Sequence, residues 1–211
     1  MDDPSFLTRL HIELARIFFE LDASDGYLVA GGAGLLASDL IARPTQDIDL
    51  FASTPISSVS EAKAELVQEL GRRGYEVNVL QDGATFCRMV VRHEASELLV
   101  DLAIDSPPIR TTVMTPLGPT LSPEELAGRK LLALFGRAEA RDFADVYVLA
   151  RHFGKDLLLE QARALDAGFD PAILAQMLGT LGRFAPDEIP LTPEDLDAAK
   201  AFFTKWAREL R

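Results

Sequence analysis

The spacing of hydrophobic positions changes about half-way along the chain. In the first half, short apolar runs predict strands over 27–30, 47–52, 75–80, 85–91 and 97–104. Apolar residues that recur every three or four positions predict helices over 5–21, 33–41 and 58–73. The second half follows helical spacing only, with helices expected over 123–135, 138–152, 155–167, 171–181 and 193–210. The chain should therefore fold as a strand-rich half followed by a helical half.

The turn and cap signals refine this outline. Asp82-Gly83 lies between two predicted strands and is typical of a hairpin, so the sheet should contain antiparallel neighbours and be mixed. Ser5 is the expected N-cap of the first helix, and the proline-containing segment 106–119 is expected to be a loop-rich link. We predict an α+β (α/β) fold in which 1–115 form the sheet-bearing core and 116–211 a helical bundle that closes its cleft.

An Asp-x-Asp pair opens the strand predicted over 47–52. Successive side chains of a strand point to opposite faces, so Asp47 and Asp49 project on one face while the residues between and after them enter the core. Two neighbouring carboxylates repel each other unless a cation lies between them. Mg²⁺ suits this position because it takes oxygen ligands and shares them with substrate phosphates, and Mn²⁺ accepts similar ligands. The pair indicates metal-assisted phosphoryl chemistry on a nucleotide.

Two further features of the first half support this interpretation. Gly31 and Gly32 follow a short apolar strand and precede a helix, where backbone N–H groups and the positive end of the helix dipole can hold phosphate. Asp101 is a lone acid within the apolar strand 97–104. A buried carboxylate needs a partner, which is either a metal shared with the Asp-x-Asp pair or an arginine. We favour the metal.

The helical half carries a cluster of charged residues. Lys130 and Arg137 are seven positions apart, hence on one face if the helix is continuous, and a cationic pair of this kind can hold a triphosphate. Asp142 and Asp145, three apart on a helix, can orient Lys130 or an arginine such as Arg141. The alternative is an ordinary salt-bridged helix surface, and spacing alone does not decide between the two.

Composition limits the partners. The formal net charge is −12, whereas nucleic-acid binders usually carry a basic field, so a polynucleotide would have to meet a local patch. Candidate patches are Arg72–Arg73, Arg88 with Arg92, and the Arg129, Lys130, Arg137 and Arg141 series. The single cysteine, Cys87, excludes an internal disulfide and is expected in the core, and the three histidines are expected at surface or capping positions. Without a signal peptide or an apolar run of membrane-spanning length, we expect a cytoplasmic protein.

These motifs together resemble a known family. The residues that carry the resemblance are Gly31-Gly32, the run Arg43-Pro44-Thr45-Gln46-Asp47-Ile48-Asp49-Leu50-Phe51, Asp101, and Lys130 with Arg141-Asp142-Phe143-Ala144-Asp145. They look like the AbiEii/MenT-type nucleotidyltransferase toxins of the polymerase-beta-like superfamily. The resemblance implies a mixed sheet that carries the carboxylates, Mg²⁺-dependent transfer of a nucleotide from an NTP to an acceptor such as the tRNA 3′ end, and a cognate antitoxin.

The resemblance also implies roles for individual residues. Asp47 and Asp49 would bind the metal, Lys130 would hold the triphosphate, and Asp142 would be the supporting acid of the helical motif, all four acting in catalysis. From the residues themselves we further expect Asp101 to be a catalytic residue that completes the metal site and takes a proton from the attacking hydroxyl, and Arg137 and Arg141 to bind the nucleotide with Lys130. Nucleotide contacts would also come from Gly31, Gly32 and Ala33. Many relatives have Ser or Thr where this chain has Ala33, so one phosphate contact of about 1 kcal/mol is missing.

Two other interpretations remain open. An aminoglycoside-type nucleotidyltransferase would use the same carboxylates on a small cationic acceptor, which the net charge of −12 suits. Gly32-Ala33-Gly34-Leu35-Leu36-Ala37 also matches the Gly-x-Gly-x-x-Ala signature of a dinucleotide site. That signature expects one acid at the end of a second strand and further βαβ units, which the chain lacks, so this interpretation is the weaker one.

Overall fold

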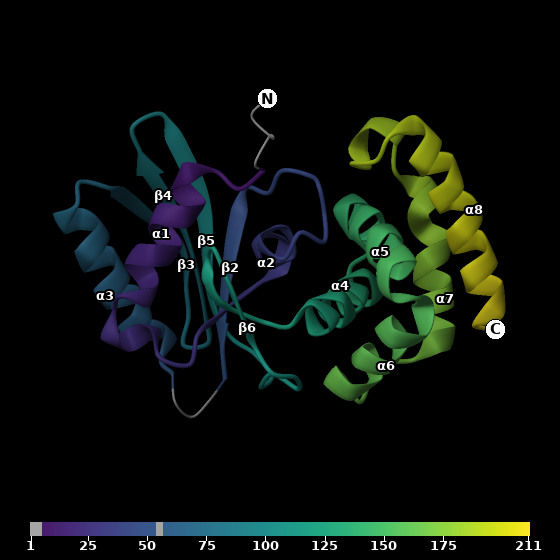
Figure 1. Ribbon diagram of the computed structural model, residues 1–211, viewed down its shortest axis with the longest axis horizontal. Coiled ribbons are helices and arrows are strands. Elements are labelled where there is room, and N and C mark those ends of the chain that lie inside the picture. Colours follow the sequence, from purple (N-terminus) through teal and green to yellow (C-terminus); the bar gives the residue numbers. More distant parts are fainter. Residues whose placement is uncertain (1–5, 54–56) are drawn as a thin grey trace. The chain divides into compact units, whose positions relative to one another are not determined.

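The computed structural model describes residues 6–53 and 57–211. The chain divides into two compact units, Met1–Pro123 and Glu124–Arg211, which are described separately below. The first unit contains all the strands together with three α-helices (Figure 1), and the second contains helices α4 to α8. The predicted α+β class, with a mixed sheet followed by helices, is confirmed.

The first unit is built on a seven-stranded sheet. Its strands follow the spatial order β3-β4-β5-β2-β1-β7-β6. Two neighbouring pairs, β2 with β5 and β1 with β7, are parallel, and the remaining pairs are antiparallel. The strands span β1 Leu28–Ala30, β2 Asp47–Ala52, β3 Glu76–Asp82, β4 Phe86–His93, β5 Ser96–Ile104, β6 Val113–Thr115 and β7 Gly118–Thr120.

Strands β6 and β7 correct one prediction. The segment 106–119, expected to be a loop-rich link, contains a short hairpin in which Met114 is opposite Pro119. Val29 of β1 is in turn the parallel partner of Thr120. Each strand has only three residues and one includes a proline, so no alternating pattern marks them in the sequence. Pairing with the distant β1 places them in the sheet.

One face of the sheet is covered by helices α1 Arg9–Phe19 and α3 Val59–Arg72 (Figure 1). Alternate residues of the central strands point into this layer and are fully or almost fully buried: Ile48, Leu50, Ala52, Leu98, Val100 and Leu102. Cys87 of β4 belongs to the same core, as predicted. The burial of alternate residues fixes the register of β2 against the core, whereas β5 is a nearly continuous apolar run interrupted by Asp101.

The N-cap of α1 is Thr8, and the predicted cap, Ser5, lies outside the described residues. The Thr8 hydroxyl accepts a hydrogen bond from the backbone N–H of His11, and the Thr8 backbone N–H donates to His11 Nδ1 at 3.3 Å, which completes a capping box. His11 is therefore a capping residue, which is one of the two roles expected for the histidines. Its side chain is nevertheless buried rather than exposed.

The second unit consists of five helices. They span α4 Pro123–Gly136, α5 Ala140–Phe153, α6 Lys155–Leu165, α7 Pro171–Leu178 and α8 Pro193–Glu209. The helix predicted over 171–181 ends earlier and continues as a 3₁₀ turn over Gly179–Arg183. Aromatic rings join α5 to α8, with the Phe143 and Phe203 rings 5.4 Å apart. Within the described ranges, no helix is both long and apolar enough to cross a membrane.

Candidate active site

A row of four paired residues crosses the sheet on the face opposite the α1 and α3 layer. In β-pairing, Ala30 is opposite Asp49, Asp49 is opposite Asp101, and Asp101 is opposite Arg88. Directly paired residues project from the same face of a sheet. The structure therefore brings Asp49 and Asp101 side by side, and Asp47 lies on the same face of β2.

Gly31 forms the floor beneath Asp49. It has φ +58, a left-handed conformation that favours glycine, and a Cβ at this position would lie 1.7 Å from Oδ2 of Asp49. Helix α2 Gly31–Ala37 begins here, at the end of β1, rather than at the predicted residue 33. Both glycines are thus in the first turn of the helix, and the Asp49 carboxylate rests directly on its backbone.

Thr45 and Gly32 form the neighbouring part of the same surface. The Thr45 hydroxyl donates a hydrogen bond of 2.5 Å to Oδ1 of Asp47, which fixes one side of that carboxylate. A Cβ on Gly32 would lie 2.9 Å from the Thr45 hydroxyl oxygen. Ala33 is fully buried within the core, so its side chain packs there rather than facing a phosphate. The sequence analysis did not single out Thr45 as a site residue.

Asp101 is held by Arg88. The Nε and Nη2 atoms of Arg88 donate to the two Asp101 carboxylate oxygens at 2.8 and 2.5 Å, a bidentate arrangement. The Asp101 side chain is 6% exposed and that of Arg88 is 42% exposed. Hydrogen bonding to Asp101, together with the negative charges of Asp101, Asp49 and Asp47, raises the pKa of Arg88. Of the two partners considered for Asp101, the structure contains the arginine.

The residues present fit a magnesium site that uses two carboxylates. Mg²⁺ is typically bound by one or two carboxylates plus substrate phosphates, and Asp47 and Asp49 supply two such groups on one strand face. Because Gly31 has no side chain, the Asp49 carboxylate can occupy the space beside its backbone. Over residues 6–53 and 57–211, no group of three His, Cys, Asp or Glu side chains is arranged to hold a metal, in keeping with the engagement of Asp101 by Arg88.

The second unit contains a buried charge network. The Lys130 Nζ atom lies 3.1 Å from Asp145 Oδ2 and 3.4 Å from Asp142 Oδ1. Lys130 is 7% exposed and both acids are almost completely buried, so this is not the ordinary salt-bridged surface that was the alternative. In the structure both acids are ion-paired with Lys130. Burying such a network is costly unless every charge is compensated, as it is here.

Arg137 completes the network from outside the helix. Helix α4 ends at Gly136, so Lys130 and Arg137 do not share one continuous helix, yet the Arg137 Nε atom lies 3.0 Å from Asp142 Oδ2. Burial would raise the pKa of Asp142, but hydrogen bonds from Arg137, the charges of Lys130 and Arg137, and the Glu139 N–H hold it below its ordinary value. Arg141 lies close by, with its Nε atom 3.0 Å from a Glu139 oxygen.

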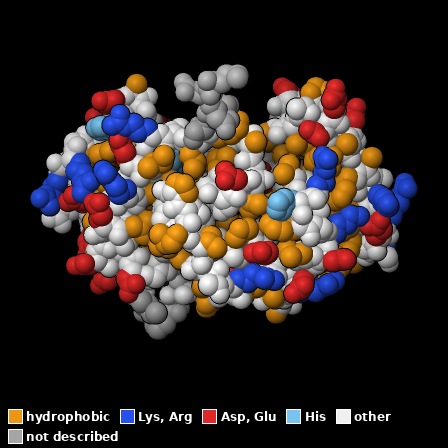
Figure 2. All heavy atoms as spheres, viewed as in Figure 1, with side chains coloured by type: hydrophobic (Ala, Val, Ile, Leu, Met, Phe, Trp, Pro, Cys, Tyr) orange, Lys and Arg blue, Asp and Glu red, His pale blue; other side chains and the backbone are white. Residues whose placement is uncertain are grey.

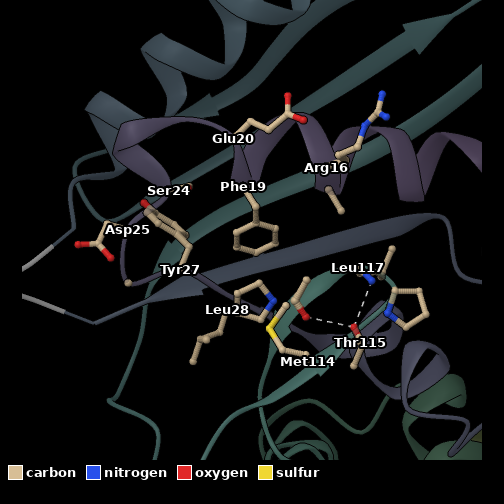
Figure 3. Close-up of a pocket in the computed structure, with 15 residues that line it drawn as sticks. Arg16, Phe19, Glu20, Ser24, Asp25, Tyr27, Leu28, Met114, Thr115 and Leu117 are labelled. Carbon is tan, nitrogen blue, oxygen red and sulfur yellow. Dashed lines mark hydrogen bonds between the residues drawn. The ribbon is translucent and has the colours of Figure 1, made fainter.

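The first unit also contains a pocket of about 730 Å³ (Figure 3). Figure 3 shows Phe19 at the end of α1, Glu20 at its C-cap, Tyr27 and Leu28 where β1 begins, and Met114 of β6 around it. No residue predicted to bind nucleotide or metal lines this pocket. It is therefore set apart from the row of carboxylates.

Comparison with known proteins identifies the chain. The profile of the family described as "Nucleotidyl transferase AbiEii toxin, Type IV TA system" matches residues 14–211. The chain belongs to this family. The AbiEii protein is thus a nucleotidyltransferase and the toxin component of a type IV toxin–antitoxin system. No curated protein matches it by sequence.

Solved structures show that the AbiEii fold is shared. A nucleotidyltransferase from Helicobacter pylori is similar with a TM-score of 0.61 at 18% identity, covering 97% of this chain and 96% of the other. The nucleotidyltransferase toxin MenT4 from Mycobacterium tuberculosis has a TM-score of 0.54 at 14% identity, covering 97% and 91%. The antibiotic-resistance factor ANT(2'')-Ia has a TM-score of 0.50 at 13% identity, covering 75% and 92%. At these identities the likeness concerns the fold.

The structure removes the dinucleotide interpretation. In a Rossmann unit the strands before and after the glycine-rich turn and its helix are parallel. Here β1 and β2, which precede and follow α2, are antiparallel. The Gly-x-Gly-x-x-Ala match falls inside α2 rather than in a loop. The glycines of the AbiEii protein instead make room for Asp49 and Thr45.

Proposed function

We propose that this AbiEii toxin transfers a nucleoside monophosphate from an NTP to an acceptor hydroxyl with the help of Mg²⁺, which Mn²⁺ can replace. The observation that carries the proposal is the placement of Asp47 and Asp49 on one strand face, with Asp49 resting on the backbone of Gly31. These two carboxylates would hold the metal. The bound metal would neutralise charge on the phosphates of the nucleotide during the displacement.

The remaining groups of the first unit act on the phosphates and the proton. Gly31, Gly32 and Ala33 offer backbone N–H groups to phosphate oxygens. The acceptor oxygen attacks the α-phosphorus, the bond from phosphorus to the bridging oxygen breaks, and pyrophosphate leaves. We propose that Asp101, beside Asp49, joins the metal site once the nucleotide is bound and that its carboxylate takes the proton of the attacking hydroxyl.

In the second unit, Lys130, Arg137 and Arg141 are proposed to bind the triphosphate. Asp142 is the supporting acid, because it holds both Lys130 and Arg137 through its two carboxylate oxygens. A buried lysine fixed by two acids is a point charge of defined position, which is what binding a developing negative charge requires. In this assignment the buried network binds substrate as well as stabilising the second unit.

The acceptor we propose is the 3′ end of tRNA, on the strength of the family resemblance, with a cognate antitoxin as the protein partner. On the face drawn in Figure 2, basic side chains are interspersed with acidic ones, so an RNA partner would rely on a local patch. A small cationic acceptor of the aminoglycoside type is the second candidate, because the net charge of −12 favours cations.

The test is transfer of label from each of the four α-labelled NTPs to total tRNA in the presence of Mg²⁺. We expect label on tRNA with the wild type and a loss of about 100- to 1,000-fold in Asp49→Asn. Glu61→Gln, which removes an exposed carboxylate from α3, is the matched control and should keep full activity. Equal activity in Asp49→Asn and wild type would overturn the mechanism. Label on members of an aminoglycoside panel but not on tRNA would show that the acceptor is a small cationic molecule rather than tRNA.

A further inference from the structure

Arg88 binds the carboxylate that would be the third metal ligand. Its guanidinium donates to both oxygens of Asp101, so a metal ion held by Asp47 and Asp49 would compete with Arg88 for either oxygen. The two residues lie directly opposite each other in the β4–β5 ladder, so the contact follows from strand register and does not depend on a loop. Asp101 is in turn opposite Asp49 in the β2–β5 ladder, so Arg88 lies on the same row of the sheet as the proposed cation site.

A guanidinium and a divalent cation compete for a buried carboxylate. Arg88 takes one acceptor site on each Asp101 oxygen, and the Asp101 side chain is only 6% exposed. Bringing a second cation next to Arg88 would also be electrostatically unfavourable. Asp101 is therefore a weaker metal ligand while the Arg88 contact is intact.

We propose that Arg88 is a positioning residue that withholds Asp101 from the metal in the nucleotide-free enzyme, so that the resting cation site is made by Asp47 and Asp49 alone. The inference rests on the metal dependence in the proposed function and deepens it. A phosphate group accepts the same bidentate fork from arginine as a carboxylate does. Arrival of the triphosphate can then draw Arg88 away and release Asp101, which links full metal binding to the presence of substrate.

The experiment measures binding of Mn²⁺ alone, without nucleotide, from the loss of the free-ion EPR signal. In the wild type, Asp49→Asn should weaken binding at least tenfold, whereas Asp101→Asn should change it less than twofold. Arg88→Gln frees Asp101 and should tighten binding about tenfold. The double variant Arg88→Gln with Asp101→Asn should return to the wild-type value, because no third carboxylate is then available.

Arg92→Gln is the matched control, because Arg92 lies on the same strand and is also paired with an acid, Glu97, at 2.6 Å. It makes the same change in net charge and should leave Mn²⁺ binding unchanged. Arg88→Lys keeps the charge without the fork, so it should tighten binding less than Arg88→Gln. Circular dichroism of each variant checks that the sheet is intact, and Arg88→Lys serves if the glutamine variant does not fold.

The outcomes separate this inference from the proposed function. If Asp101→Asn weakens Mn²⁺ binding as much as Asp49→Asn does, Asp101 is already a ligand and the inference is wrong, while the metal site stands. Tight binding that persists in the double variant would also overturn it. If neither wild type nor any variant binds Mn²⁺, the inference fails, and transfer assays with Mg²⁺ and with chelator then judge the proposed function by itself.

Discussion

The Oδ2 atom of Asp49 lies where a side chain on Gly31 would begin, since a Cβ there would be 1.7 Å from it. Gly31 directly follows β1 and Asp49 lies in β2, and the antiparallel pairing of these two strands brings the residues together. Gly31 also has φ +58, which is unfavourable for any residue with a Cβ. The conformation of the glycine and the position of the carboxylate are therefore two parts of one arrangement.

Replacing Gly31 with alanine should damage activity more than stability. The left-handed conformation costs about 1–2 kcal/mol in alanine, and the added methyl group must displace the Asp49 carboxylate. A shift of a catalytic group by about 1 Å lowers rates roughly 100-fold. We expect nucleotide transfer to fall by about that factor, with the loss of unfolding free energy, measured in urea, near the conformational cost.

Gly71→Ala is the control for this substitution. Gly71 lies within α3, and a Cβ there would meet nothing within 4 Å. Since alanine is the better helix former, the variant should gain about 0.5–1 kcal/mol of stability and keep its activity. Full transfer activity in Gly31→Ala would show that Asp49 does not need its observed position.

The pKa of Asp142 predicts how the second unit responds to acid. Because the folded-state pKa is below the ordinary value, the ionised group stabilises the fold at neutral pH. That contribution is present above the unfolded pKa, near 4, and is lost as the pH falls through the lower folded pKa. Asp142→Asn should lose about 3–5 kcal/mol at pH 7, since Lys130 and Arg137 lose a buried partner. The gap to wild type should narrow below pH 4.

Trp206 makes the stability difference between Asp142→Asn and wild type measurable, because it is the single tryptophan of the chain and is buried in α8 of the same unit. Its fluorescence in urea, followed from pH 7 to pH 3, reports the unfolding free energy of the second unit. Asp187→Asn, an exposed carboxylate in that unit, should stay within about 0.5 kcal/mol of the wild type throughout. A constant gap between Asp142→Asn and wild type at every pH would contradict the assignment.

The buried hydroxyl group of Tyr27 contributes no hydrogen bond to the described part of the fold. Its oxygen is buried and has no hydrogen-bond partner in the described part of the chain, and burial raises its pKa to about 12. An unsatisfied buried hydroxyl is destabilising, while the ring packs edge-to-face against Phe18 with centroids 5.2 Å apart. Tyr27→Phe keeps the ring contact and should leave stability unchanged or raise it by about 1 kcal/mol in urea denaturation.

The tyrosine absorbance provides a second readout. The chain has three tyrosines, and with a pKa of about 12 Tyr27 should be only about one tenth ionised at pH 11 in the native protein. The titration curves of wild type and Tyr27→Phe should therefore coincide up to about pH 10 and separate above it. A loss of more than about 1 kcal/mol in the variant would mean that the hydroxyl has a partner.

The elements with strong alternation were predictable from sequence. Strand β2 spans Asp47–Ala52 as predicted, because acidic and apolar residues alternate over its first four positions and apolar residues complete it. The hairpin β6–β7 was missed because its stability comes from the distant β1. The sequence therefore identified every strand that carries its own pattern, and it did not reveal strands created by pairing alone.

The site was predictable in its residue types but not in all its pairings. Asp47, Asp49 and Lys130 stand out as charged residues in apolar surroundings. Arg88 was noted only as part of a basic patch, because its partner lies in another strand. The tight turn at 94–95, where Glu94 has φ +54, aligns β4 with β5. Counting outward from that turn would have placed Arg88 opposite Asp101.

The parallel contact between Val29 and Thr120 has a consequence for how the toxin is made. The strand that leads into Gly31 is among the first parts of the chain to be synthesised, but one of its two neighbours is among the last parts of the first unit. Contacts of long sequence separation form late in folding. A growing chain therefore keeps β1 as an open edge until synthesis passes Thr120. A product that terminates before that residue would lack the strand that covers β1, next to Gly31, so toxicity should require chains that have been translated through the whole first unit.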